Sequence, residues 1–278
     1  MPSTEPSEPV LLRQLDEHGV LLLTFNRPDR NNGWCLELEE AYFGALIEGS
    51  SDSAVRVIVV TGAGRSFCPG MDIQILEQSA KSGTHSTATS RRWPMTTARW
   101  IPKPMIAAVN GACAGIGFVQ MTCCDLRFAA STAKFTTAFA RRGLPAENSL
   151  SWMLPRLIGT GNALDLLLSA RVVLADEALQ LGLVNRVYPA DELLPAALAY
   201  ARDLADNCSP TSMALIKQQV SRDWERSAEE SRLQSLVLMS EMGAHADFSE
   251  GVMSYQEKRQ ATFGGYAEEL KIPRSINR

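Results

Sequence analysis

The chain has 278 residues, of which 45% are hydrophobic, and its formal net charge at pH 7 is −4. This length allows a sizeable core in one or two domains, and the weakly acidic charge excludes the overall basic field of a nucleic-acid-binding protein. No apolar run is long enough to span a bilayer, so we expect no insertion into a membrane.

Residues 1–9 are acidic and proline-rich and lack the apolar centre of a signal peptide, so we expect a disordered start to a cytoplasmic protein. The six cysteines show neither metal-ligand nor disulfide-framework spacing. The adjacent Cys123 and Cys124 lie in an apolar stretch, which favours small buried side chains in a reducing compartment.

The hydrophobic pattern predicts strands in the first half of the chain and mostly helices in the second. Residues 10–15 and 20–26 are predicted to form a hairpin, and residues 36–47 have helical spacing with acidic side chains early. Further strands are predicted over 55–61, 105–109, 126–129 and 134–135. Helices are predicted over 152–158, 163–169, 176–181, 193–207, 211–224, 228–242 and 248–259. By itself this order is also compatible with two separate domains.

Two of the predicted strands end at glycine-rich turns. The strand over 55–61 is followed by Gly62 and Gly64, and the strand over 105–109 by Gly111. Glycine lets the backbone turn sharply or approach a ligand closely, although each turn alone is equally typical of an ordinary loop. Two peptide N–H groups aimed at one carbonyl oxygen stabilise the oxyanion that forms there.

The residue sequences of these two segments resemble the signatures of a known family. Residues 65–73 (RSFCPGMDI) resemble the first signature of the enoyl-CoA hydratase/isomerase (crotonase) superfamily, and residues 104–125 resemble the second. The resemblance extends to 23–28 with Asn32, to 178–185 and to 257–259, and it covers about 10–263.

This resemblance implies an α/β fold: a crotonase-like spiral of β-β-α units with a C-terminal helical trimerisation region, often paired into hexamers. The corresponding division is a disordered start over 1–9, a spiral core over 10–200 and a helical oligomerisation region over 201–278. No sequence repeat matching the β-β-α units is visible.

The resemblance also implies the oxyanion-hole donors, which are the backbone N–H groups of Met71 and Ile116. Ile116 stands where the family commonly has glycine, and a backbone donor survives that change if its angles stay allowed. Its β-branched side chain is expected to narrow the pocket. A helix starting near Gly115 directs its positive end at the thioester oxygen.

Hydratases of this family use two glutamates to activate water, and the matching positions here are Val119 and Phe139. Neither side chain moves a proton. Residues 142–152 (RGLPAENSLSW) instead resemble a segment of 3-enoyl-CoA to 2-enoyl-CoA isomerases, in which a glutamate at the position of Glu147 shuttles the proton. Without the resemblance, Glu147 reads as a solvated charge beside a loop.

For coenzyme A, the resemblance implies that Arg27 or Arg30 meets the pyrophosphate and that the backbone of Met71, Asp72 and Ile73 lines the ligand path. Two further coenzyme A-binding residues, Tyr255 and Lys258, are expected to reach the active site of a neighbouring subunit. Trp34 stands where smaller residues are usual and is a candidate for shortening the acyl tunnel.

Between the two signatures, residues 79–92 are polar and rich in serine and threonine, and we expect a mobile segment there. His85 within it is a candidate base because histidine titrates near neutral pH, although a solvated loop histidine is the commoner case.

Three hypotheses follow. The first is an enoyl-CoA isomerase with Glu147 as base, acting on an acyl-CoA substrate with no cofactor beyond the coenzyme A of that substrate. The second is hydration or another acyl-CoA transformation that uses Glu147. The third is a non-catalytic acyl-CoA-binding protein, since fold does not imply activity. A homotrimer or hexamer is expected in each case.

Overall fold

The computed structural model describes residues 8–83 and 91–266, and its strands form two sheets. The six-stranded sheet has the order β1-β2-β3-β5-β7-β10 and is parallel except for the β1/β2 hairpin. Its strands are β1 (Leu11–Leu15), β2 (Val20–Phe25), β3 (Val57–Gly62), β5 (Met105–Val109), β7 (Leu126–Ala130) and β10 (Arg186–Tyr188).

The smaller sheet has the order β4-β6-β8-β9 and consists of β4 (Ser66–Cys68), β6 (Ala112–Ala114), β8 (Lys134–Thr136) and β9 (Val173–Leu174). Three times in succession the chain leaves the large sheet and enters the small one after a short turn: β3 to β4, β5 to β6, and β7 to β8. This repeated step is the spiral that the resemblance implies, and it exists in the backbone path although no repeat is visible in the sequence.

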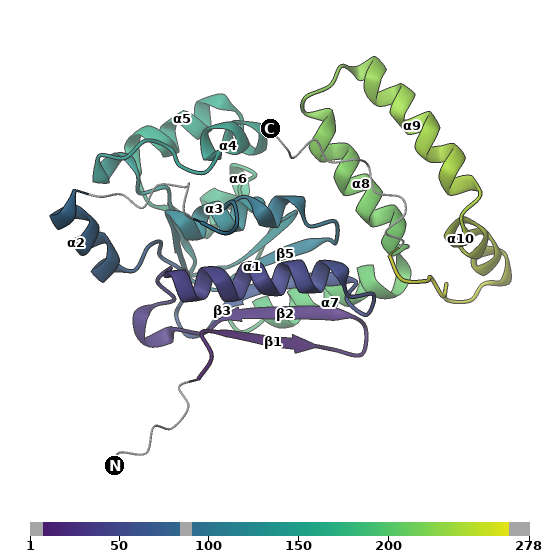
Figure 1. Cartoon of the computed structure of the whole chain (residues 1–278), viewed down its shortest axis with the longest axis horizontal. Coiled ribbons are helices and arrows are strands. Elements are labelled where there is room, and N and C mark those ends of the chain that lie inside the picture. Colours follow the sequence, from purple (N-terminus) through teal and green to yellow (C-terminus); the bar gives the residue numbers. More distant parts are fainter. Residues whose placement is uncertain (1–7, 84–90, 267–278) are drawn as a thin grey trace, which may run out of the picture.

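The first helices, α1 (Leu36–Ser51), α2 (Ile73–Ser82) and α3 (Ile116–Cys123), alternate with the strands. The later helices are α4 (Leu150–Ile158), α5 (Thr160–Ser169), α6 (Ala175–Gln180), α7 (Leu193–Asn207), α8 (Pro210–Asp223), α9 (Ala228–Gly243) and α10 (Ala246–Glu257). In Figure 1, α2 lies at one end of the molecule and α8 to α10 form an arm at the other.

Alternation along the central strand β3 gives the large sheet two buried faces. Ile58 and Val60 belong to the main core, whereas Val57 and Val59 face α7. That helix presents a stripe of small residues to the sheet, Ala197, Ala201 and Ala205, all fully buried. Because β3 is covered on both sides, it reads as a continuous apolar run in the sequence.

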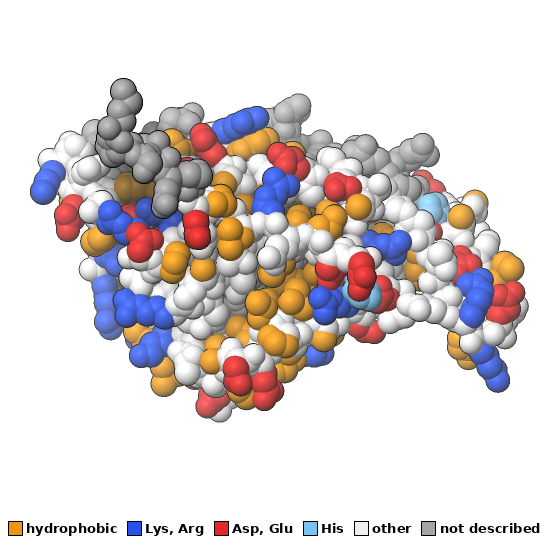
Figure 2. Space-filling view, turned by 90° about the horizontal axis from the view of Figure 1, so that it is seen from below, with side chains coloured by type: hydrophobic (Ala, Val, Ile, Leu, Met, Phe, Trp, Pro, Cys, Tyr) orange, Lys and Arg blue, Asp and Glu red, His pale blue; other side chains and the backbone are white. Residues whose placement is uncertain are grey.

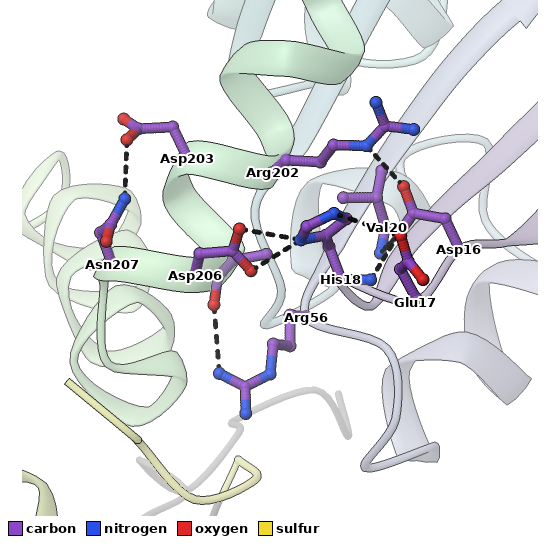
Figure 3. Close-up of polar contacts among 10 residues, drawn as sticks. Asp16, Glu17, His18, Val20, Arg56, Arg202, Asp203, Asp206 and Asn207 are labelled. Atoms are coloured by element: carbon purple, nitrogen blue, oxygen red, sulfur yellow. Dashed lines mark hydrogen bonds and ion pairs between the residues drawn. The ribbon is translucent and has the colours of Figure 1, made fainter. Parts of the chain in front are cut away.

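The β1/β2 turn is fixed to the end of α7 by a polar cluster (Figure 3). Nδ1 of His18 lies 2.8 Å from a carboxylate oxygen of Asp206, and Nε of Arg202 donates to Asp16 at 2.8 Å. Arg56 donates to the backbone carbonyls of Ala205 at 3.1 Å and Phe263 at 2.9 Å. The cluster therefore joins the start of the described chain to its end.

The pattern-based elements are largely confirmed, with two departures. The segment predicted to be mobile over 79–92 is wrong in part, because residues 79–82 complete α2, which Asp72 caps by accepting from the Gln74 N–H at 3.1 Å. His85 lies outside the described residues, as do residues 1–7 of the predicted disordered start. The second departure is that β4, β6, β9 and β10, all of three residues or fewer, are not predicted.

The C-terminal arm, α8 to α10, stands out from the sheets as the narrower end of the molecule in Figure 2. Its own hydrophobic cluster is small and consists, within the described residues, of the buried Leu215 and Leu238 with Met242 packed against them. Within the described residues, no helix has the length and apolarity that a bilayer crossing requires.

Candidate active site

Glycines bring the two predicted signature segments into direct contact. A Cβ added to Gly117 would lie 2.0 Å from the backbone oxygen of Cys68, and one added to Gly111 would lie 2.0 Å from that of Arg65. At the tips of the two turns, a Cβ on Gly115 would lie 3.6 Å from the Cα of Gly70. The absence of side chains at these positions therefore sets how closely the turns meet.

Each turn presents a free peptide donor. The Met71 N–H and the Ile116 N–H have no hydrogen-bond partner among the described residues. Met71 is held from both sides, because Trp34 donates to the Gly70 carbonyl at 2.8 Å and accepts from the Asp72 N–H at 2.9 Å. Ile116 is the first residue of α3, so its N–H lies at the positive end of that helix.

Both donors border one cavity of about 420 Å³. Its wall is mostly apolar, with two arginines and one carboxylate. The lining residues are Met71, Ile75, Leu76, Ser79, Arg91, Gly115, Ile116, Ala138, Phe139, Arg142, Leu144, Pro145, Ala146, Glu147 and Asn148.

Glu147 is half-buried on this wall, and its carboxylate has no hydrogen bond or ion pair with another described residue. The next two residues, Asn148 (φ 51°) and Ser149 (φ 61°), both adopt the left-handed conformation before α4 begins. Such conformations cost about 1 kcal/mol or more per non-glycine residue and concentrate at functional sites. The direction of Glu147 is therefore set by the backbone of the turn and not by a side-chain partner.

The two positions that carry glutamates in hydratases differ in their surroundings. Phe139 lies on the cavity wall next to Ala138, another left-handed residue (φ 63°). Val119 is fully buried in α3 and belongs to the main core. A carboxylate is absent from both positions, so Glu147 is the only acidic residue among the lining residues.

A thiol also lies close to the turn that carries Gly70 and Met71. Cys68 is fully buried, and its Sγ is 3.8 Å from the Gly70 carbonyl oxygen. Burial raises the pKa of Cys68 to about 12, so the thiol stays protonated and does not serve as a nucleophile.

Arg27 and Asp72 have structural partners. Nη2 of Arg27 lies 3.1 Å from Asp72 Oδ2, and Nη1 donates to the Gly33 carbonyl. The fully buried Asn32 fixes the same loop, since its side-chain amide donates to Ser66 at 2.7 Å and to Ala63 at 2.9 Å. Two nitrogens of the Arg27 guanidinium are therefore used inside the loop, and contact of Arg27 or Arg30 with a pyrophosphate stays a prediction.

Arg30 and Ile73 are open to solvent. The Arg30 side chain is 42% exposed and has one loose contact with Asp29 at 4.0 Å. Ile73 is 60% exposed at the start of α2 and lines a neighbouring hollow of about 450 Å³, which shares Leu76 and Arg142 with the main cavity.

Tyr255 and Lys258 are at the far end of the molecule from α2, on and just after α10 (Figure 1). Tyr255 is 85% exposed, and Lys258 ends the helix in a left-handed conformation. Neither residue lines the cavity of its own chain.

The expectation that Trp34 shortens the tunnel is wrong. Trp34 is fully buried beside Phe25 and Tyr42 and is not among the described residues that line the cavity. Its Nε1 donates to Glu39 at 2.9 Å, and Glu39 also accepts from the cavity residue Arg91. Sequence reasoning assigns no role to either arginine, although Arg91 lies in the polar segment 79–92 and Arg142 begins the segment 142–152 that resembles the isomerases.

Comparison with known proteins identifies the family. The profile described as enoyl-CoA hydratase/isomerase matches residues 16–266. The chain belongs to the enoyl-CoA hydratase/isomerase family.

Its relatives in the family carry both activities in their names. The 1,2-epoxyphenylacetyl-CoA isomerase of Escherichia coli is 32% identical over 90% of this chain and 96% of that protein. A probable enoyl-CoA hydratase/isomerase from Mycobacterium abscessus has a similar structure, with TM-score 0.84, 31% identity, and coverage of 92% of this chain and 98% of that one. An enoyl-CoA hydratase from Mycobacterium marinum is 45% identical, with TM-score 0.68 and coverage of 79% and 100%. The crotonase-type fold is thereby shown.

Proposed function

We propose that this member of the enoyl-CoA hydratase/isomerase family moves the double bond of a 3-enoyl-CoA to the 2-position, with Glu147 as the base. One observation carries the proposal: the unpartnered carboxylate of Glu147 shares a mostly apolar cavity with the two unpartnered N–H groups of Met71 and Ile116.

The reaction needs only one base. The Glu147 carboxylate removes a proton from the α-carbon, and the electron pair moves onto the thioester oxygen to give a dienolate. The Met71 and Ile116 N–H groups stabilise that oxygen, an effect of about 3–4 kcal/mol per donor in other enzymes. The protonated Glu147 then returns the same proton to the γ-carbon, which leaves the double bond between the α- and β-carbons.

Hydration has less support. It requires a water held near the β-carbon by an acid–base pair, and phenylalanine and valine occupy the two positions where hydratases of the family have glutamates. The apolar Phe139 on the wall also favours exclusion of water.

Coenzyme A enters the proposal as part of the substrate, with no further cofactor. Lys and Arg side chains gather at the end of the molecule where α2 lies (Figure 2). The exposed side chain of Arg30 is available to a phosphate group of coenzyme A. Because Tyr255 and Lys258 are remote from their own cavity, we propose that they contact the coenzyme A bound to a neighbouring subunit of a trimer or hexamer.

The test is product identification with a base-deleted variant. Purified protein is incubated with 3-enoyl-CoA and 2-enoyl-CoA thioesters, and products are identified by NMR and mass spectrometry. Glu147→Gln keeps the shape of the side chain and removes the base, so the turnover rate should fall by about 10²- to 10⁴-fold while affinity for a saturated acyl-CoA is unchanged. Glu40→Gln, an exposed site on α1, is the matched control.

A turnover rate of Glu147→Gln within a few-fold of the wild-type rate would exclude Glu147 as the base. A 3-hydroxyacyl-CoA as the main product of the wild type would replace isomerisation by hydration. Binding of acyl-CoA without turnover of any thioester would favour a non-catalytic binding protein.

A further inference from the structure

A buried polar chain reaches the wall of the cavity from behind. Trp34, fully buried, donates through Nε1 to Glu39 at 2.9 Å, and the Glu39 side chain is only 4% exposed. The same carboxylate oxygen accepts from Nη1 of Arg91, whose side chain is 16% exposed and lines the cavity. Met95 Sδ lies 3.1 Å from the same Nη1.

Among the described residues, Arg91 is thus held through one nitrogen, Nη1, which leaves Nε and Nη2 as donors for a ligand. A guanidinium has five N–H groups. The Nε and Nη2 of Arg91 make no hydrogen bond with another described residue. These donors belong to a residue that lines a cavity with an otherwise mostly apolar wall.

A purely hydrocarbon acyl chain fits this arrangement poorly. It would displace water from the Arg91 donors without offering an acceptor, and an unsatisfied charged donor is costly in free energy. The buried Glu39–Arg91 pair carries its own desolvation cost, so it is weak evidence for stability alone. An arginine held rigidly with free donors facing a ligand cavity is typical of recognition.

We propose that Arg91 determines substrate specificity by binding an oxygen atom on the distal part of the acyl group. This inference rests on the proposed acyl-CoA function and adds the substrate class: an acyl-CoA with a neutral oxygen acceptor, such as a carbonyl, hydroxyl or ether, away from the thioester.

The charges around the cavity favour a neutral acceptor over a carboxylate. Arg91 and Arg142 on the wall are balanced by Glu147 on the wall and by Glu39 behind it. A second carboxylate would add an uncompensated negative charge close to Glu147, and like charges in a poorly solvated site repel each other. A carbonyl oxygen accepts from the free Arg91 donors without changing this balance.

The experiment measures binding of thioesters that cannot react, so it does not depend on turnover. Dissociation constants are measured by calorimetry for three isosteric ligands: 4-methylpentanoyl-CoA, 4-oxopentanoyl-CoA and succinyl-CoA. The same comparison is made two methylenes longer, with 6-methylheptanoyl-, 6-oxoheptanoyl- and adipoyl-CoA. For at least one length, the oxo ligand should bind about 10- to 100-fold more tightly than the hydrocarbon, as expected for a hydrogen bond to a charged group.

Arg91→Met should abolish this preference, whereas Arg92→Met, an exposed neighbour outside the cavity, should retain it. If Arg91→Met does not fold, Arg91→Met combined with Glu39→Gln removes both buried charges and keeps an acceptor for the Trp34 N–H.

Equal binding of the oxo and hydrocarbon ligands by the wild type, at both lengths, would overturn the proposal. So would a preference that survives in the Arg91 variant, or tighter binding of the carboxylate than of the ketone. Failure of the isomerase assay would leave these affinities interpretable, so the two proposals fail separately.

Discussion

The spiral core and the C-terminal arm differ in how many of their side chains they bury. Every residue of β3 is buried, and the core cluster around it includes side chains from both sheets and from helices α1, α3 and α4. By contrast, α9 has 16 residues, and one of them, Leu238, is buried.

The arm has many exposed apolar side chains for the few that it buries. On α9, Leu236 is 55% exposed and Met239 is 69% exposed, and on α10 Tyr255 is 85% exposed. The core carries the cavity. The arm keeps an unsatisfied apolar surface, and large surfaces of this kind mark interaction sites.

The buried thiols of the core should make the free energy of unfolding fall at high pH. An unfolded cysteine ionises near pH 9, whereas burial raises the pKa of Cys68 and Cys123 to about 12 and raises those of Cys113 and Cys124 as well. Above pH 9 the unfolded chain therefore binds fewer protons than the folded one, and stability falls as pH rises.

Lys103 acts in the opposite direction, because burial lowers its pKa to about 8 and the unfolded state binds more protons between that pH and 10.5. Four thiols outweigh one amine, so the unfolding free energy should fall as pH rises near pH 10, with a slope measured by urea unfolding in a reducing buffer. Cys113→Ala should lower this slope by about 1.4 kcal/mol per pH unit. An unfolding free energy that does not change from pH 8 to 10.5 would contradict the described burial of the thiols.

Glycine-to-alanine substitutions in the core and in the arm should have opposite effects on stability. Gly117→Ala places a Cβ 2.0 Å from the Cys68 carbonyl oxygen, so we expect a loss of about 3 kcal/mol or more in unfolding free energy, together with loss of the oxyanion hole. Gly243→Ala at the end of α9 has no atom within 4 Å and should instead stabilise by about 0.5–1 kcal/mol. Chemical denaturation of both variants tests this, and equal effects would refute the contrast between core and arm.

The smallest stability effect is expected from the exposed face of the arm, where the change should affect assembly. If a second copy covers α9, Met239→Lys should shift the protein towards monomers in size-exclusion light scattering, while Met239→Leu keeps the apolar surface and the assembly. The melting transition of the isolated chain should change little, because Met239 is mostly exposed. An unchanged mass for Met239→Lys would show that this face is not the contact between copies.

Sequence reasoning predicts elements best where a single period runs unbroken. Met105–Val109 and Leu193–Asn207 are predicted with their observed bounds, because one is a continuous apolar run and the other has helical spacing throughout. Strands such as β4 and β6 have three residues, too few to establish a period, and they are defined by their partners in the small sheet. Helix α2 has apolar residues on one face, where Ile73, Leu76 and Ala80 line a hollow, but none of its residues is buried, and its last four residues belong to the polar segment 79–92.

The same limit applies to the site. The motifs predict that Met71, Ile116 and Glu147 serve one reaction, and the fold brings them to one cavity. The ion pair between Arg27 and Asp72 joins residues 45 positions apart, and the ion pair between Arg91 and Glu39 joins residues 52 positions apart. Neither pairing has a local pattern, because a partner distant along the chain is selected only by the folded backbone.

The His18–Asp206 contact has a consequence for synthesis on the ribosome. The two residues are 188 positions apart, so the turn of the first hairpin leaves the ribosome long before its partner exists. At ordinary elongation rates of about 5–20 residues per second, that interval is roughly 10–40 s. During this time β2 and β3 lack α7, which packs against both of them in the folded chain. The turn of the first hairpin is therefore fixed to the rest of the fold only after α7 has been made.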